Sequence, residues 1–136
     1  MIEKERHPQL VRSLQKENKT WWTLNPMSYD WHGSNGYEEG SAEFFREIDR
    51  RFFSSSPLFE GSKPFGRFIP FPELKGKRAL EIGCGLGSHS QLLAEAGCQL
   101  SSIDLTSRAV ALTKGRLKLN ELPGEVLEMD GENMTF

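Results

Sequence analysis

The alternation of apolar and polar residues changes character near residue 77. After that position, short apolar runs alternate with stretches of helical periodicity, and glycine or proline separates them. The pattern predicts strands over 78–82, 99–104 and 125–130 and helices over 88–96 and 107–120. Strands that alternate with helices form a parallel sheet with right-handed crossovers, so we expect an α/β fold. Because Ala79, Leu80 and Ile82 are all apolar, we expect the first strand to be covered on both faces.

Residues 1–76 lack this alternation, and we expect them to form an N-terminal extension of helices and loops. Apolar residues at helical spacing predict a short amphipathic helix over about 8–17 and a second helix over 41–53, with Ser41 as its N-cap. Serine and proline residues then interrupt the helical pattern, which makes 54–76 a linker.

A stretch of the extension, residues 20–37, combines aromatic side chains with residues that favour loops. Its aromatic residues are Trp21, Trp22, Tyr29, Trp31 and Tyr37. Aromatic side chains in such a loop can line or cover a pocket, and they can equally anchor an arm to the domain. Both interpretations stay open at this point.

Composition narrows the classes of protein. The formal net charge is −2 and the pI is about 5.9, so no basic surplus argues for a nucleic-acid partner. Cys84 and Cys98 form neither a C-x-x-C pair nor a secreted framework, which favours a reducing compartment. The sequence has no apolar run of membrane-spanning length and no signal-peptide core. We therefore expect a cytoplasmic protein with no membrane partner and no bound metal.

A glycine-rich turn follows the first predicted strand. Gly83, Gly85 and Gly87 alternate with other residues, and their missing Cβ atoms let the chain turn sharply and let a ligand approach the backbone. The dinucleotide fingerprint G-x-G-x-x-G needs glycine or alanine at its sixth position, where this chain has Ser88. The fingerprint therefore fails, and we expect Ser88 to cap the following helix.

An acid, Glu81, precedes the glycines in the pattern acid-x-G-x-G-x-G. The chain here resembles the class I S-adenosylmethionine-dependent methyltransferases of the small-molecule type (type 11/25-like). The resemblance is carried by Leu-Glu-Ile-Gly-Cys-Gly-Leu-Gly at 80–87, Ser-Ile-Asp-Leu-Thr at 102–106 and Met-Asp-Gly-Glu-Asn at 129–133. It covers roughly residues 75–136, and three motifs in this order and spacing make it specific.

The resemblance implies a Rossmann-like sheet that binds S-adenosylmethionine at the carboxyl ends of its first three strands. In this family, the acid at the position of Glu81 helps to hold the amino group of the cofactor. The acid at the position of Asp104 accepts hydrogen bonds from the ribose hydroxyls. The residues at the positions of Leu105, Asp130 and Gly131 contact adenine. The expected cofactor-binding residues are Glu81, Gly83, Cys84, Gly85, Gly87, Asp104, Leu105, Asp130 and Gly131.

Simpler interpretations exist for several of these residues. Glu81 can pair with the cation at position 77 or 78, Asp104 can cap a helix, and Asp130 can be a turn residue. Cys84 fits a site that needs a small residue, and we do not expect it to be a nucleophile. His89 near the helix start can contact the ligand or lie at the surface.

The sequence ends at Phe136, soon after the third predicted strand, whereas the family sheet has seven strands with the fourth beside the first. We therefore expect residues 77–136 to be an incomplete half-domain, the N-terminal portion of a longer enzyme. The first strand would then present an unpaired apolar edge, which favours self-association.

The expected function is methyl transfer from S-adenosylmethionine to a small-molecule acceptor. The sequence names neither the accepting atom nor a general base. A non-catalytic module that binds S-adenosylmethionine or a partner is an alternative, and it would bind the cofactor without turnover. An NAD-dependent oxidoreductase is a further alternative, against which Ser88 argues.

Overall fold

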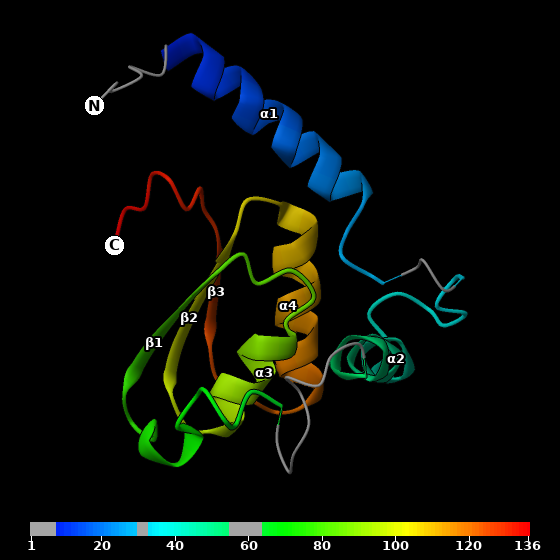
Figure 1. Cartoon of the computed structure of the whole chain (residues 1–136), viewed down its shortest axis with the longest axis vertical. Coiled ribbons are helices and arrows are strands. Elements are labelled where there is room, and N and C mark those ends of the chain that lie inside the picture. The colour runs from blue at the N-terminus through cyan, green and yellow to red at the C-terminus, as the bar shows by residue number, and fades with distance from the viewer. Residues whose placement is uncertain (1–7, 30–32, 55–63) are drawn as a thin grey trace.

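Parallel strands alternate with helices in the second half of the chain, and two helices precede them (Figure 1). This computed structural model describes residues 8–29, 33–54 and 64–136. The elements are α1 (Pro8–Leu24), α2 (Ala42–Phe53), the 3-10 helix η3 (Phe71–Glu73), β1 (Arg78–Ile82), α3 (Ser88–Glu95), β2 (Gln99–Asp104), α4 (Ser107–Leu119) and β3 (Glu125–Glu128). None of the described helices has the length and apolar character that crossing a membrane requires.

The strands pair in the order β1-β2-β3, and both pairings are parallel. Ile82 lies opposite Ile103, and Asp104 lies opposite Glu128, so the carboxyl ends of the strands share one edge of the sheet. The predicted α/β fold is confirmed, and β1 and β2 have the predicted bounds. β3 ends at Glu128, two residues earlier than predicted, although the N–H of Met129 still donates to the carbonyl of Asp104 (2.9 Å).

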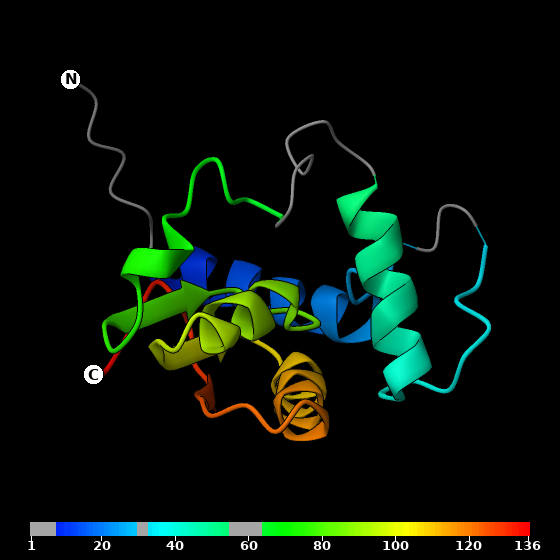
Figure 2. The ribbon, with the colours of Figure 1, turned by 90° about the horizontal axis from the view of Figure 1, so that it is seen from below.

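Helices α3 and α4 cover one face of the sheet (Figures 1 and 2). The apolar cluster between them and the sheet consists of Cys84, Ala94, Leu100, Val110, Leu117 and Val126. Ala79 of β1 packs against this cluster, and its neighbours point to the opposite face because side chains alternate along a strand. Leu80 and Ile82 are 46% and 57% exposed. The expectation that β1 is covered on both faces is therefore wrong for the described residues, because both helices lie on the same side.

Helix α2 forms a further layer beyond α3 and α4 (Figures 1 and 2). Ser41 caps it as predicted, with its hydroxyl accepting from the N–H of Phe44 (3.1 Å). The apolar stripe of α2 is buried in a second cluster, made of Phe44, Phe45, Ile48, Leu86 and Leu112. Leu86 belongs to the glycine-rich turn, so α2 packs directly on that turn.

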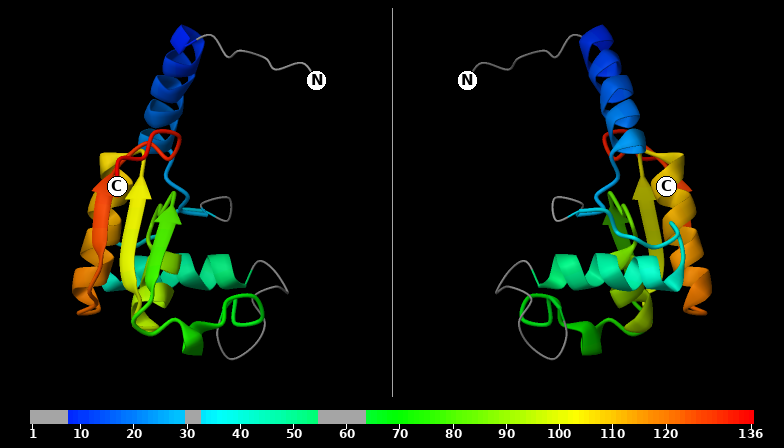
Figure 3. Two further views of the ribbon diagram at one scale, coloured as in Figure 1. Left: turned by 90° about the vertical axis from the view of Figure 1, so that its left-hand side faces the viewer. Right: turned by 90° about the vertical axis from the view of Figure 1, so that its right-hand side faces the viewer.

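Helix α1 is longer than predicted, since it continues to Leu24 instead of ending near residue 17. Trp21 and Trp22 are therefore helical. The hydroxyl of Thr23 donates to the carbonyl of Lys19 within the helix (2.7 Å), and Arg108 of α4 donates to the carbonyl of Thr23 (2.9 Å). An arginine more than 80 positions away thus binds the end of this helix, and a local sequence pattern cannot show that contact. Figure 3 shows α1 across the end of the sheet to which the strands point.

The N-terminus of α3 differs from the prediction. Its N-cap is Gly87, in the left-handed conformation with φ +79°, and Ser88 is the first helical residue. The hydroxyl of Ser88 does not cap the helix and instead donates to Asp49 of α2 (2.7 Å). A long-range contact has therefore taken the side chain that the local pattern assigned to a cap.

A buried arginine joins α2, α4 and the glycine-rich turn. The side chain of Arg116 is 1% exposed and forms an ion pair with Asp49. It also donates to the side chain of Gln91 (2.8 Å), to the hydroxyl of Ser88 (3.3 Å) and to the carbonyl of Leu86 (3.4 Å). A guanidinium has five N–H donors, and this environment supplies oxygen acceptors from three directions.

Removing this arginine should destabilise the fold. We expect Arg116→Met to lower the free energy of unfolding by about 3 kcal/mol, because it leaves Asp49 without its cation in a largely desolvated site. Arg46→Met is the matched control, since the ion pair of Arg46 with Glu43 is mostly exposed and should contribute at most about 1 kcal/mol. Urea unfolding measures both. Equal losses in the two variants would contradict the assigned role of Arg116.

Substitution by alanine should change the free energy of unfolding in opposite directions at Gly87 and Gly115. A Cβ on Gly87 would lie 3.0 Å from Thr113 Oγ1 and 3.2 Å from Arg116 Cδ, and the left-handed φ adds strain. We expect Gly87→Ala to cost about 2–4 kcal/mol. A Cβ on Gly115 would meet no atom within 4 Å, so Gly115→Ala in α4 should stabilise the protein by about 0.5–1 kcal/mol. A gain from Gly87→Ala in urea unfolding would refute the assigned geometry.

Candidate cofactor-binding site

A cavity of about 440 Å³ lies at the carboxyl ends of β1 and β2. This volume is in the usual range for a small-molecule site. Five of the nine predicted cofactor residues line the cavity, namely Gly83, Cys84, Gly85, Asp104 and Leu105. Glu81, Gly87, Asp130 and Gly131 do not line it. The structure therefore brings together the glycine-rich turn and the end of β2, and leaves the end of β3 outside the cavity wall.

The glycine-rich turn presents its backbone to the cavity. Gly83 and Gly85 have φ values of +78° and +54°, and a Cβ on either would meet no atom within 4 Å. Since both residues line the cavity, such a Cβ would take up open space at its wall. Gly87 differs, because its missing Cβ lets the turn pack closely on α4. Gly83 and Gly85 thus leave space for a ligand, and Gly87 lets the turn pack against α4.

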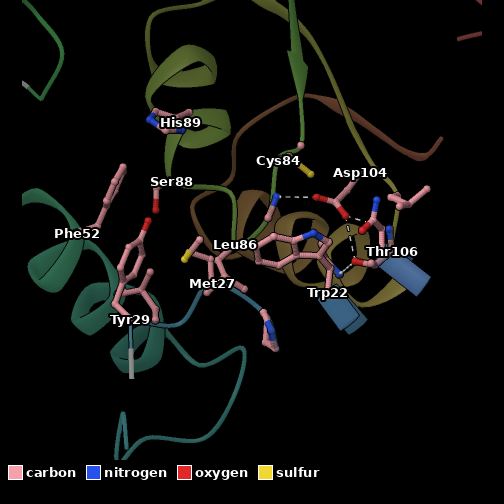
Figure 4. Close-up of a pocket in the computed structure, with 17 residues that line it drawn as sticks. Trp22, Met27, Tyr29, Phe52, Cys84, Leu86, Ser88, His89, Asp104 and Thr106 are labelled. Atoms are coloured by element: carbon pink, nitrogen blue, oxygen red, sulfur yellow. Dashed lines mark hydrogen bonds between the residues drawn. The ribbon is translucent and has the colours of Figure 1, made fainter. Parts of the chain in front are cut away.

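Asp104 is the acidic residue at the end of β2, and its carboxylate holds the turn in place. Oδ2 accepts from the N–H of Gly85 (3.0 Å), and Oδ1 accepts from the N–H (2.9 Å) and the hydroxyl (3.0 Å) of Thr106 (Figure 4). The two oxygens of a carboxylate offer about four acceptor positions, so these three bonds leave capacity for a ligand donor. The hydroxyl of Thr106, and not Asp104, caps α4.

Four N–H groups of the turn are already engaged within the protein. Those of Gly83 (2.8 Å) and Cys84 (3.0 Å) donate to the carbonyl of Ile103, and that of Gly87 donates to Cys84 (2.9 Å). The N–H of Gly85 donates to a carboxylate. A dinucleotide site instead directs such groups at a pyrophosphate. These four groups are therefore not free to bind a pyrophosphate, and the turn has the carboxylate of Asp104 as its neighbour.

Glu81 does not line the cavity and makes polar contacts with neighbouring side chains. Its carboxylate accepts from the hydroxyls of Ser90 and Ser102, the latter at 3.2 Å, and its side chain is 10% exposed. Burial raises the pKa of Glu81, and the two hydroxyls partly offset this. Nδ1 of His89 lies 3.7 Å from its other oxygen. Its partners are thus hydroxyl groups and a histidine, and not the cations at positions 77 and 78.

The two predicted adenine contacts at the end of β3 lie outside the cavity. The carboxylate of Asp130 accepts from the N–H of Glu132 two residues on (2.9 Å), as in a turn. Gly131 lies against β1, since a Cβ there would be 2.8 Å from Ile82 Cγ2. A contact of Asp130 or Gly131 with adenine stays a prediction.

Cys84 lines the cavity but is not poised for nucleophilic chemistry. Burial raises the pKa of its thiol to about 12. The thiolate, which is the reactive form, is therefore negligible near neutral pH. This agrees with the expectation that Cys84 is a small residue of the turn.

Residues before the sheet supply a further part of the cavity wall, and motif analysis missed these residues. Met27, Tyr29 and Phe52 lie on the side of the cavity away from Asp104, and the rings of Tyr29 and Phe52 stack with centroids 5.1 Å apart (Figure 4). Trp22 lies beside Asp104, whereas Trp21 is 61% exposed. The aromatic stretch therefore contributes to the pocket, as one of its two interpretations held.

Some aromatic residues of that stretch do not contribute to the wall. Tyr37 is 53% exposed and lies outside the cavity. Trp31 lies outside the described residues. The clustering of tryptophan before the sheet was the available signal, and it could not identify which of these rings faces a ligand.

Comparison with known proteins assigns the second half of the chain. Residues 79–136 match the family described as methyltransferase domain. An uncharacterized RNA methyltransferase of Protochlamydia amoebophila is 34% identical over 110 residues, which is 76% of this chain and 25% of that protein. A ubiquinone biosynthesis O-methyltransferase of Aromatoleum aromaticum is 32% identical over 78 residues, which is 52% of this chain and 32% of that protein. The chain thus spans about a quarter to a third of the length of these relatives.

A solved structure supports the fold. The crystal structure of the [4+2]-cyclase SpnF superposes with a TM-score of 0.52 and 18% identity, over 90% of this chain and 44% of that one. At this identity the likeness concerns the fold alone. Residues 79–136, with their parallel sheet, thus match the methyltransferase domain family, which supports the resemblance to the class I S-adenosylmethionine-dependent methyltransferases.

Proposed function

We propose that the chain binds S-adenosylmethionine at the carboxyl ends of its strands and serves methyl transfer to a small-molecule acceptor. The observation that carries this proposal is the carboxylate of Asp104, bonded to the N–H of Gly85 at the wall of a cavity of about 440 Å³. Its remaining acceptor capacity suits the ribose hydroxyls, and its charge suits a cationic ligand. The occupied N–H groups of the turn argue against an NAD-dependent oxidoreductase.

The residues of the chain would act by binding and orientation. Asp104 would accept from the ribose, and the bare backbone of Gly83 and Gly85 would let the ligand lie close to the turn. When bound, S-adenosylmethionine supplies an activated methyl group on a positively charged sulfonium. Tyr29 and Phe52, which line the cavity, would exclude water from it. Methyl transfer requires mainly that water is excluded and that the acceptor is aligned with the methyl group.

A small-molecule acceptor is favoured over RNA by the arrangement of the arginines. On α2, Arg46 pairs with Glu43, and Arg50 and Arg51 both pair with Glu47. Arg108 of α4 likewise pairs with Glu39. These cations are neutralised within the protein, and the net charge is −2, so they offer little attraction for a phosphate backbone. The relatives named for RNA and for ubiquinone biosynthesis leave both classes in view, and the aromatic cavity supports the smaller acceptor.

A non-catalytic module that binds S-adenosylmethionine is the second candidate. The likeness to a [4+2]-cyclase favours keeping it, because the same fold there carries a different named activity. Binding of S-adenosylmethionine without turnover would distinguish the module from the enzyme.

Binding of S-adenosylhomocysteine tests the proposed site directly. We expect calorimetry to detect binding to the 136-residue chain and Asp104→Ala to weaken it at least about 100-fold, because the variant loses the ribose acceptor and the bond that holds the turn. Glu125→Ala is the matched control, since it removes an exposed carboxylate at the opposite end of the sheet and should leave affinity unchanged.

NAD serves as the control ligand, and we expect no signal from it. Folding of Asp104→Ala is checked by its circular dichroism and its melting transition, which separates a lost site from a lost fold. A folded wild-type chain that ignores S-adenosylhomocysteine but binds NAD would end the methyltransferase proposal.

The affinity for the sulfonium should depend on pH through His89, which lines the cavity. Burial lowers the pKa of His89, followed by repulsion from Arg116, so its imidazole is neutral at pH 7. Below that lowered pKa the ring becomes cationic and repels the ligand. Once the ring is protonated, we expect the affinity for S-adenosylmethionine to fall about threefold to tenfold more than that for S-adenosylhomocysteine, whose sulfur is uncharged.

His89→Gln removes the titrating ring while keeping a polar side chain. In this variant the two ligands should follow the same pH dependence, as calorimetry at several pH values can measure. An unchanged difference between them in His89→Gln would show that another group causes it.

A further inference from the structure

The cavity wall next to Asp104 is built by α1 as well as by the sheet. If Asp104 holds the ribose, the base attached to that ribose must lie in the adjoining part of the cavity. There the described residues of the wall are Leu105, Thr106 and Ala109 from the sheet side and Asn18 and Trp22 from α1. The end of β3, which the family resemblance associates with adenine, does not reach this wall.

Asn18 and Trp22 are one helical turn apart, so they lie on the same face of α1. Trp22 is 44% exposed although its ring faces the cavity beside Asp104 and Thr106 (Figure 4). The amide of Asn18 has no hydrogen-bond partner among the described residues. Trp22 thus offers a flat apolar face, and the amide of Asn18 offers a hydrogen-bond donor and an acceptor that no described residue occupies.

These two groups match the chemistry of a purine. An indole stacks on the face of a base, and a carboxamide can pair with the amino group and the ring nitrogen at the edge of adenine. Helix α1 is held over the strand ends by polar contacts, which include the bond from Arg108 to its last turn and the ion pair between Lys19 and Glu128. Its position is therefore set independently of any ligand.

We propose that Trp22 stacks on the adenine of the bound nucleoside and that Asn18 reads the edge of that ring. This inference rests on the proposed binding of S-adenosylmethionine and extends it to residues outside the methyltransferase motifs. It adds α1 to the predicted contacts of the base, and the contact of Asp130 with adenine stays a separate prediction.

The experiment compares variants of the full chain by calorimetry with S-adenosylhomocysteine and with adenosine. We expect Trp22→Ala to weaken both ligands about 5- to 100-fold, which is the usual value of one stacked base. Trp21→Ala is the matched control, because it removes a neighbouring ring that is exposed and outside the cavity. It should change affinity less than about twofold. Trp22→Leu keeps an apolar side chain without the indole, and we expect it to bind more weakly than wild type.

Asn18 is tested by its choice between bases. The wild-type chain should prefer adenosine to inosine, which lacks the amino group, and Asn18→Leu should lose most of that preference. Fluorescence gives an independent readout, since quenching of tryptophan by S-adenosylhomocysteine should persist in Trp21→Phe and fall in Trp22→Phe. A melting transition for each variant excludes loss of α1 as the cause.

The outcomes separate this inference from the proposal on which it rests. If S-adenosylhomocysteine fails to bind the wild-type chain, the proposed function fails first. If it binds and Asp104→Ala weakens it, but Trp22→Ala and Trp21→Ala behave alike, the assignment of the base to α1 is wrong. Loss of adenosine binding in Asp130→Asn, with Trp22→Ala unaffected, would overturn it in favour of the end of β3.

Discussion

The ion pair between Arg116 and Asp49 is the constraint on which the arrangement of the site depends. A guanidinium that is 1% exposed must find acceptors inside the protein, because leaving it unpaired would cost several kcal/mol. It finds them on α2 and on the turn between β1 and α3, where it binds the carbonyl of Leu86 and the hydroxyl of Ser88. Helix α2, helix α4 with Arg116, and the turn are distant in sequence, and one desolvated charge fixes their relative positions.

The glycine-rich turn is consequently supported from one side and open on the other. On the supported side, the hydroxyl of Thr113 donates to the carbonyl of Gly85 (3.1 Å), and Gly87 packs against the same threonine. On the sheet side, Asp104 accepts from the N–H of Gly85. With these contacts made, the open side of the turn is the cavity wall. The turn is thus prepared before any ligand arrives, which lowers the conformational cost of binding.

Sequence predicted the elements whose signals are local. The apolar run of β1 and the amphipathic stripe of α2 with its cap at Ser41 each lie within a few residues, and both were located correctly. Predictions failed where a distant partner decides the outcome. Ser88 was assigned to a cap but bonds to Asp49, 39 positions away. Helix α1 was placed too short because its last turn is held by Arg108.

The same reasoning explains which part of the candidate site was visible in the sequence. The glycines and Asp104 were found because backbone approach and ribose binding need particular residue types at particular spacings. A wall residue needs only bulk and an apolar face, which many residues provide, so Trp22, Met27 and Phe52 carried no motif. All three precede residue 79, where the family match begins.

The separation between motif residues after position 79 and cavity-wall residues before it bears on the choice of methyl acceptor. The matched residues 79–136 hold the glycine-rich turn and Asp104, which are the features expected to serve the shared cofactor. The relatives named for RNA and for ubiquinone biosynthesis match 76% and 52% of this chain, although their names point to different acceptors. The cavity walls supplied by α1, α2 and residues 26–29 lie outside the family match, and we expect them to contribute to the choice of acceptor. Because α2 is bound to the turn through Arg116, a change of those walls in evolution has to preserve the buried charge pair.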